Sequence, residues 1–284
     1  MLLKNNIDGR SLPSAVLMLG TIASTQMGAI LAKPLFESLG AVGASSLSFT
    51  VAALVLVLWR RPNLRRYSPQ AQGLAAAMGL VLAAMTLCLY GAIARLPLGI
   101  AIALQFVGPL GLSAVQSCRR LDLAWVVLAA TGIALLSPVG NANLDPLGMG
   151  LALLAGLLLA GYIVIATQVG HRFAQGEGAA IALSVSALAL LPMGLTTVPH
   201  LSLGFLAVGA GVALLSTVVP LTLDSIVLKR TSAKTFGVLL SLEPAVAALL
   251  GLFFLGEQLI PRALVGIALV MVAAAGHARF QISC

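Results

Sequence analysis

The hydrophobic pattern of the chain consists of ten apolar stretches, each about 20 residues long and separated from the next by a short polar break. A helix rises about 1.5 Å per residue, so about 20 helical residues cross a hydrocarbon core of about 30 Å. Turn residues and charges fill the breaks, as in the segment RRPNLRRYSPQ that begins at Arg60. The pattern predicts ten transmembrane helices, at residues 12–32, 41–59, 72–92, 97–117, 123–139, 147–168, 178–198, 203–224, 233–255 and 261–279.

The composition excludes a water-soluble globular protein. Of the 284 residues, 60% are hydrophobic and 8% are charged, whereas an ordinary soluble domain carries about 25% charged residues. The three cysteines, Cys88, Cys118 and Cys284, are odd in number and lack the spacing of metal ligands. We therefore expect no disulfide framework, no metal site and no cofactor.

The net charge of +8 is distributed unevenly among the breaks. If the N-terminus is cytoplasmic, 13 of the 16 Lys and Arg residues fall on the cytoplasmic side, and only Lys33, Arg95 and Arg262 fall opposite. Basic residues favour cytoplasmic loops, so we predict that both termini are cytoplasmic. Because these arginines hold loops to an anionic membrane face, a nucleic-acid partner is excluded. Lys33 is interpreted as a boundary residue whose long side chain reaches the interface, with a role at the exit gate as the alternative.

The two halves of the chain resemble each other and predict an internal repeat. Pro109 and Pro244 are 135 positions apart, and the same offset pairs Arg95 with Arg230, Gly43 with Gly178 and Asp122 with Glu257. We predict a first repeat at residues 10–140 and a second at 145–279, with five helices each. An odd number of helices per repeat gives the repeats opposite orientations, the inverted plan of many secondary transporters. The alternative is chance matching between helices rich in Ala and Leu.

Each predicted half contains an interrupted helix. Pro109 and Pro244 lie within apolar stretches, where proline removes an amide donor and leaves the carbonyl four residues earlier without its helical partner. Such carbonyls must be satisfied by protein or by water in a cavity. Interrupted helices at matching positions indicate the substrate site of a secondary transporter. We predict that both prolines act as hinges or cavity walls, with a passive kink as the alternative.

Glu243, directly before Pro244, is the acidic residue deepest in an apolar stretch. A charge at the bilayer centre costs about 2.5–3.5 kcal/mol on insertion scales, so it normally faces a cavity or a partner. As an anion it could bind a substrate ammonium group, and when protonated it could couple export to proton influx. Alternatively, its carboxyl caps the backbone opened by Pro244.

Other polar residues inside the stretches are candidates for lining a central pocket. Each could offer hydrogen bonds to a zwitterion, or could instead bond its own helix or lie at the lipid interface. Small residues recur every four positions from Gly148 to Ala160 and predict close helix packing. The candidate substrate-binding residues are Gln26, Thr86, Tyr90, Gln105, Tyr162, Ser241 and Glu243.

Three segments carry a resemblance to a known family: TQMGAILAKPLF (25–36), LPLGIAIALQFVGPLG (96–111) and TFGVLLSLEPAVAALLGLFFLGEQL (235–259). They resemble the EamA family of the drug/metabolite transporter superfamily, and within it the threonine/homoserine exporters and YddG-type amino-acid exporters of bacteria. The resemblance implies an all-α, ten-helix inner-membrane protein with two repeats.

The resemblance and the residues together predict an exporter of amino acids or related small metabolites that works by alternating access. We expect it to be a monomer or a weak dimer in the bilayer, with protons as a candidate coupling ion. One alternative is a carrier of drugs, aromatic compounds or nucleotide-linked metabolites. An enzyme is a remote alternative, because His, Asp, Glu and Ser do not cluster at one membrane face, so we expect no catalytic residues. A channel lacks its usual charge ring or filter loop.

Overall fold

The computed structural model describes residues 14–115, 145–173, 176–195, 202–230, 242–257 and 260–280, together with isolated positions between 124 and 135. These residues are almost entirely helical and include no β-strand, which confirms the expected all-α class. The longer helices are α1 (Ser14–Arg60), α2 (Pro69–Ile93), α6 (Pro146–Arg172), α7 (Glu177–Leu195) and α12 (Pro261–Phe280). The shorter ones are α3 (Leu98–Gln105), α4 (Val107–Val115), α8 (Leu203–Ala213), α9 (Val219–Arg230) and α11 (Glu243–Leu255), with a 3-10 turn η1 (Leu64–Arg66) and a π-helix η3 (Leu214–Val218).

Six described segments are long and apolar enough to cross a membrane: Val16–Phe36, Ser38–Arg60, Pro69–Ile93, Pro146–Arg172, Glu177–Leu195 and Leu203–Asp224. They match six of the stretches expected from the sequence. Shorter apolar helices cover Leu98–Pro109, Glu243–Leu255 and Pro261–Ala273. The count of ten stays a prediction, because most of the stretch at 123–139 and the first half of that at 233–255 lie outside the described residues.

The first two predicted spans join within α1. Gly40 separates them with a left-handed φ of 67°, which an L side chain rarely adopts, so the chain turns there without a polar loop. The second span ends near Arg60, whose guanidinium lies 4.7 Å from the centre of the Trp59 ring. Glycine therefore provides the turn that the sequence pattern had assigned to a break between residues 32 and 41.

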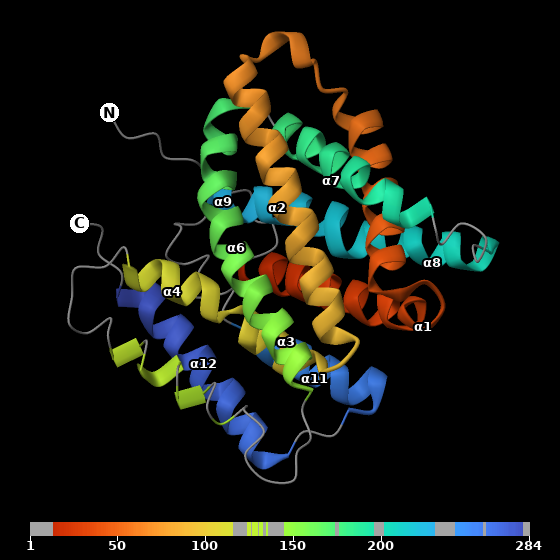
Figure 1. The fold of residues 1–284 in the computed structure, drawn as a ribbon. Helices are drawn as coiled ribbons and strands as arrows, with labels where there is room; N and C mark the ends of the chain where they lie inside the picture. Colours follow the sequence, from red (N-terminus) through yellow and green to blue (C-terminus); the bar gives the residue numbers. More distant parts are fainter. Residues whose placement is uncertain are drawn as a thin grey trace, which may run out of the picture.

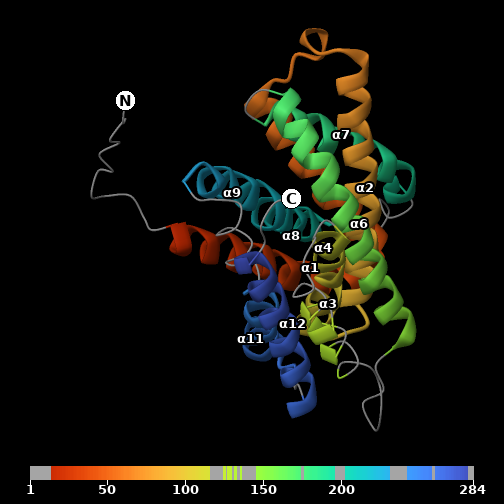
Figure 2. The ribbon, with the colours of Figure 1, turned by 90° about the vertical axis from the view of Figure 1, so that its left-hand side faces the viewer.

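Two groups of helices are joined by a central pair (Figures 1 and 2). The central pair, α2 and α6, lies side by side along most of its length. On one side, α7 packs against α1 and α2, and α8 and α9 pack against α1. On the other side, α3 and α4 pack against α6, while α11 and α12 pack against α3. The space where α1, α2, α6, α9 and α11 come together is the setting of the site described below.

The close contact of α6 with its neighbours depends on the small residues predicted from the sequence. Gly148, Ala152, Gly156 and Ala160 are all buried. A Cβ atom on Gly156 would lie 2.5 Å from the carbonyl oxygen of Gln105, and one on Gly148 would lie 2.9 Å from Leu96 Cγ. The expectation that this stripe serves packing is confirmed.

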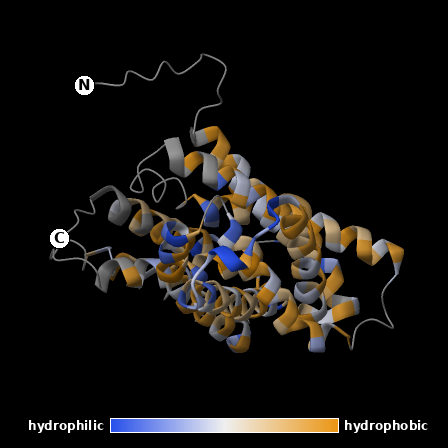
Figure 3. Ribbon diagram, turned by 90° about the horizontal axis from the view of Figure 1, so that it is seen from above, coloured by the Kyte–Doolittle hydropathy of each residue, from blue (hydrophilic) through white to orange (hydrophobic). Residues whose placement is uncertain are grey.

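The outward surfaces of the helices are strongly apolar. Leu58, Leu157, Leu203 and Phe253 are each more than 65% exposed. Seen from above, most of the outer helices are coloured as hydrophobic, and hydrophilic residues gather toward the middle (Figure 3). Exposed apolar surface of this extent indicates contact with lipid.

The stretch at 97–117 is interrupted near Pro109, as the sequence predicted, because α3 ends at Gln105 and α4 begins at Val107. Another stretch differs from its predicted form. The stretch predicted to end at residue 224 continues as α9 to Arg230. Asp224, interpreted from the sequence as the end of that stretch, therefore lies within a helix.

Candidate functional site

A cavity of about 280 Å³ lies between the two groups of helices. Its polar lining comes from α1, α2, α6, η3, α9 and α11, and the rest of its wall is apolar. Pockets for small molecules are mostly apolar with a few placed polar groups, and this one lies near the lower end of their usual size of about 300–1,000 Å³. The polar residues that line it are Thr25, Gln26, Ser48, Thr86, Tyr90, Tyr162, Ser216, Thr217, Asp224 and Glu243.

Five residues predicted from the sequence line this cavity, namely Gln26, Thr86, Tyr90, Tyr162 and Glu243. Gln105 is buried at the break between α3 and α4, where its carbonyl faces Gly156, and it is not among the lining residues. Ser241 lies outside the described residues. Pro109 and Pro244 do not line the cavity either; each lies in the first turn of a helix, α4 and α11 respectively.

Glu243 is held at the cavity by Gln26. The Gln26 amide Nε2 donates a hydrogen bond of 2.9 Å to Glu243 Oε1, which links α1 to the first residue of α11. The Gln26 side chain is completely buried, and its carbonyl oxygen Oε1 makes no hydrogen bond. Because the amide group donates to the carboxylate, the amide carbonyl must point the other way. The site thus contains a carboxylate with one fixed partner and a neighbouring acceptor with none.

Asp224 is the charged lining residue that the sequence did not predict, and the neutral polar residues Thr25, Ser48, Ser216 and Thr217 were not predicted either. Asp224 lines the same cavity as Glu243 and Tyr162. Thr21 approaches it without completing a hydrogen bond, and both Thr21 Oγ1 and Asp224 Oδ1 are buried and unpartnered. The spacing Thr217, Pro220, Leu221, Asp224 was an available signal, because these positions share one face of a helix and all of them line the cavity.

The π-helix η3 shapes the same wall. It carries Ser216 and Thr217 and ends just before Pro220, which lacks an amide hydrogen. Ser24 Oγ donates to the carbonyl of Leu215 at 2.8 Å, so α1 satisfies one backbone oxygen of this segment. A Cβ atom on Gly28 would collide with Ser216 Oγ, so this approach requires glycine. π-helical turns are frequent at functional sites.

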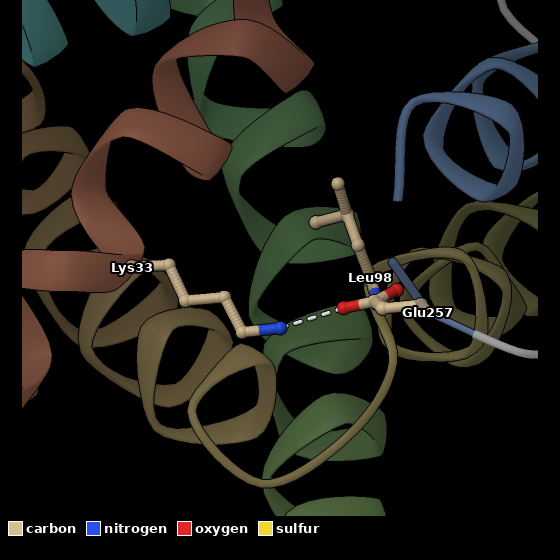
Figure 4. A network of polar contacts seen from close by, with 3 residues as sticks. All are labelled: Lys33, Leu98 and Glu257. Carbon is tan, nitrogen blue, oxygen red and sulfur yellow. Dashed lines mark hydrogen bonds and ion pairs between the residues drawn. The ribbon is translucent and has the colours of Figure 1, made fainter. Parts of the chain in front are cut away.

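A second acidic residue, Glu257, follows the other end of α11 (Figure 4). Its Oε1 lies 2.6 Å from Lys33 Nζ of α1, and its Oε2 accepts the amide hydrogen of Leu98 at 2.8 Å. Leu98 is the first residue of α3, whose N-terminus carries no side-chain cap of its own. The carboxylate therefore caps α3 and pairs with α1 at once. The sequence interpretation of Lys33 as a residue reaching toward the interface did not include this ion pair.

The turn that aims Glu257 depends on two glycines. Gly256 has a φ of 63° and ends α11 in the left-handed region. A Cβ atom on Gly251 would lie 2.5 Å from Glu257 Oε2, so that glycine leaves room for the carboxylate. Lys33 and Glu257 follow predicted odd-numbered spans, and their opposite charges on one membrane side were the available signal for this pair.

The charges around the cavity are of one sign. Within the described part of the chain, no Lys, Arg or His lines it. Within the same residues, no group of three His, Cys, Asp or Glu side chains could hold a metal ion. A cavity with two carboxylates and seven hydroxyl groups can bind a cationic group and donate hydrogen bonds to an anionic one.

Comparison with known proteins places the chain in a family. The model of the EamA-like transporter family matches residues 146–277. The threonine/homoserine exporter RhtA of Escherichia coli K12 is 37% identical over 267 residues, covering 92% of this chain and 90% of RhtA. RhtA of Salmonella typhimurium LT2 is 36% identical over 271 residues, covering 93% and 90%. The uncharacterized transporter YwfM of Bacillus subtilis 168 is 31% identical over 168 residues, 56% of this chain and 55% of YwfM.

A protein crystal structure with 17% sequence identity superimposes with a TM-score of 0.63, covering 92% of this chain and 95% of the other. That likeness concerns the fold alone. Identity of more than a third along nearly the whole length of RhtA confirms the family expected from the three sequence segments. The chain belongs to the EamA-like transporter family of the drug/metabolite transporter superfamily and is a multi-pass protein of the bacterial inner membrane.

Proposed function

We propose that this protein is a secondary transporter that exports small amino acids, of which threonine and homoserine are the first candidates. The observation that carries the proposal is a cavity of about 280 Å³ with a carboxylate held at its wall, in a chain 37% identical to a threonine/homoserine exporter. A carboxylate can bind the ammonium group that every amino acid carries, and the surrounding hydroxyls can donate to its carboxylate.

The proposed mechanism is alternating access by two inverted repeats of five helices, at residues 10–140 and 145–279. Supporting this, Pro109 is the third residue of α4 and Pro244 the second residue of α11, so both prolines occupy the first turn of a helix. Glu243 then lies beside the second of these turns. Rocking of one helix group against the other would open the cavity first to one side of the membrane and then to the other.

The proposed topology has ten spans and both termini in the cytoplasm. Its support is the 13 basic residues that fall on one side when the N-terminus is placed inside. In this topology Lys33 and Glu257 lie at the outer side, since each follows an odd-numbered span. Glu243 also remains the candidate for proton coupling, because a carboxyl at a cavity can bind a proton and a substrate in alternation.

Transport into proteoliposomes tests the proposal. Purified protein would be offered labelled threonine, homoserine, an aromatic amino acid, a drug cation and a nucleotide-linked sugar, with and without a pH gradient. We expect saturable transport of threonine and homoserine, faster than transport of the other three. Preference for the drug cation or the nucleotide-linked sugar would favour the alternative carrier class, and absence of transport of all five would contradict the proposal.

A further inference from the structure

We infer that Asp224 is a substrate-recognition residue that, together with Glu243 and the Gln26 carbonyl, forms a binding site for the substrate's ammonium group. This inference deepens the proposed function and rests on it. Asp224 lies on α9 one helical turn beyond Pro220 and lines the cavity together with Glu243 and Gln26. Its position brings a second carboxylate to a cavity wall where the sequence predicted only one.

Two acceptor oxygens at the cavity have no hydrogen-bond donor. Asp224 Oδ1 and Gln26 Oε1 are both buried without a hydrogen-bond partner, and Glu243 Oε1 receives only the Gln26 amide. Buried acceptors without donors destabilise a protein by about 1–3 kcal/mol each, and unpaired charges by more. No described side chain donates a hydrogen bond to Asp224 Oδ1 or Gln26 Oε1, so both oxygens can accept from a ligand.

Gln26 provides evidence that is independent of the two acidic residues. Its side chain is completely buried and lines the cavity. Its amide nitrogen donates one hydrogen bond to Glu243, and its carbonyl oxygen has no partner. An amide whose NH2 is fixed by one carboxylate and whose carbonyl stays unpaired is poised to accept from a ligand donor.

A substrate ammonium group is the kind of donor that these acceptor oxygens can bind. A primary ammonium group carries three N–H donors and a positive charge, and no acceptor. Glu243, Asp224 and the Gln26 carbonyl offer acceptors, of which two belong to carboxylates. No Lys, Arg or His among the described lining residues competes for them. Recognition of the amino group should therefore dominate over recognition of the substrate carboxylate, for which only hydroxyl donors are present.

The test is competition against counterflow of labelled L-threonine in proteoliposomes that contain the full chain. The competitors are L-threoninol, which keeps the ammonium and hydroxyl but lacks the carboxylate, and 3-hydroxybutyrate, which lacks the ammonium. For the wild type we expect competition by threoninol and at least tenfold weaker competition by 3-hydroxybutyrate. Equal competition by both compounds would overturn the inference.

The variant is Asp224→Asn, with Thr222→Val as its matched control on the same helix. Thr222 does not line the cavity, and its hydroxyl donates to the carbonyl of Val218. We expect Asp224→Asn to raise the KM for threonine and the half-inhibitory concentration of threoninol at least tenfold, and Thr222→Val to change either by less than twofold. Asp224→Glu, which keeps the charge, should preserve the preference for threoninol.

Two outcomes distinguish failure of this inference from failure of the proposed function. If Asp224→Asn binds threonine and threoninol as tightly as the wild type, the inference is overturned. This holds even if the variant loses its response to a pH gradient, because that loss would assign proton binding, and not substrate recognition, to Asp224. The thermal midpoint of each variant is measured to check that it folds. If Asp224→Asn does not fold, Asp224→Ser is used in its place. If the wild type transports no amino acid, the proposed function itself is contradicted. If the wild type transports threonine and Asp224→Asn behaves like it, only this inference is contradicted.

Discussion

A glutamate lies at each end of α11, and the two differ in how many charged and hydrogen-bonding partners they have. Glu257, just beyond the C-terminal end, has a lysine at 2.6 Å and a backbone amide at 2.8 Å. Glu243, at the N-terminal end, has one neutral amide at 2.9 Å and shares its cavity with a second carboxylate. A buried carboxylate with its full set of partners stabilises the fold, whereas one left short of donors is available to a ligand.

The position of each residue explains the difference. Glu257 joins α1, α3 and the end of α11, and its side chain is 10% exposed. Glu243 faces a cavity bounded by both helix groups, where a permanent ion pair would block access to substrate. We therefore propose a structural role for Glu257 and a transport role for Glu243, which variants of the two residues can separate.

The largest effect is expected from Glu243→Gln. The amide keeps the size and most of the hydrogen bonding but removes the charge, and a hydrogen bond to a charged group contributes about 1.5–3 kcal/mol. Threonine transport should therefore fall at least about tenfold, while the thermal midpoint stays near that of the wild type. Transport is measured per folded molecule in proteoliposomes.

If Glu243 only caps the backbone near Pro244, the result reverses. Glu243→Gln would then transport at the wild-type rate with an unchanged response to a pH gradient, and Glu243→Ala would lower the thermal midpoint. Such a pair of results would reject the transport role of Glu243 and leave the site to the other polar lining residues.

Glu257→Gln should mainly affect stability. It removes the ion pair with Lys33 and the charge on the cap of α3, so we expect a loss of about 1.5–3 kcal/mol in the free energy of unfolding. Transport per folded molecule should change less than threefold. Adding Lys33→Met to this variant should cost little more, because the lysine has already lost its partner, and a double-mutant cycle measures that coupling.

Asp145→Asn is the matched control for Glu257→Gln. Asp145 pairs with Arg95 at 3.2 Å, but both side chains are about two-fifths exposed, and an exposed pair contributes about 0–1 kcal/mol. Asparagine also preserves the cap that Asp145 provides to Leu147 at the start of α6. If Asp145→Asn and Glu257→Gln lower the free energy of unfolding equally, the Lys33–Glu257 pair contributes no more to stability than an exposed pair.

A smaller effect is expected from Pro109→Ala and Pro244→Ala. If the prolines act as hinges, each replacement restores an amide donor and slows transport a few-fold, while the surrounding helices keep the protein folded. Pro192→Ala, in α7 and away from the cavity lining, is the control and should leave the rate unchanged. Wild-type rates in Pro109→Ala and Pro244→Ala would identify both as passive kinks.

The side of the membrane on which Glu257 lies can be determined without changing activity. In a cysteine-free background, single cysteines near Asn143 and His200 should react with an impermeant reagent added from outside, and cysteines near Arg65 should not. That pattern assigns both termini to the cytoplasm and the Lys33–Glu257 pair to the outer side. The reverse pattern would contradict the proposed topology.

Much of the helical architecture could be predicted from residue type and spacing. Long apolar stretches require about 20 residues to cross a membrane, so six of them appear as helices of membrane length. Glu243 could be predicted because a carboxyl inside an apolar stretch is costly without a partner or a cavity. The stripe of Gly148 and Gly156 predicted close packing because small residues allow backbones to approach.

The remainder depends on contacts between distant parts of the chain. Lys33 and Glu257 are 224 positions apart, and no local pattern gives their distance. Asp224 was missed because the apolar stretch was ended at its first charge, although the helix continues to Arg230. The left-handed Gly40 and the π-helix before Pro220 change the path of the backbone without changing hydropathy, so periodicity alone does not reveal them.

Direct binding of L-threonine to the purified protein, measured by titration calorimetry for the wild type and for Glu243→Gln, tests the central claim that the cavity around Glu243 is the substrate site. The account predicts saturable binding at one site in the wild type and binding at least about tenfold weaker in Glu243→Gln. Glu257→Gln, if folded at the temperature of measurement, should bind like the wild type. Equal affinity of the wild type and Glu243→Gln for threonine would contradict the account.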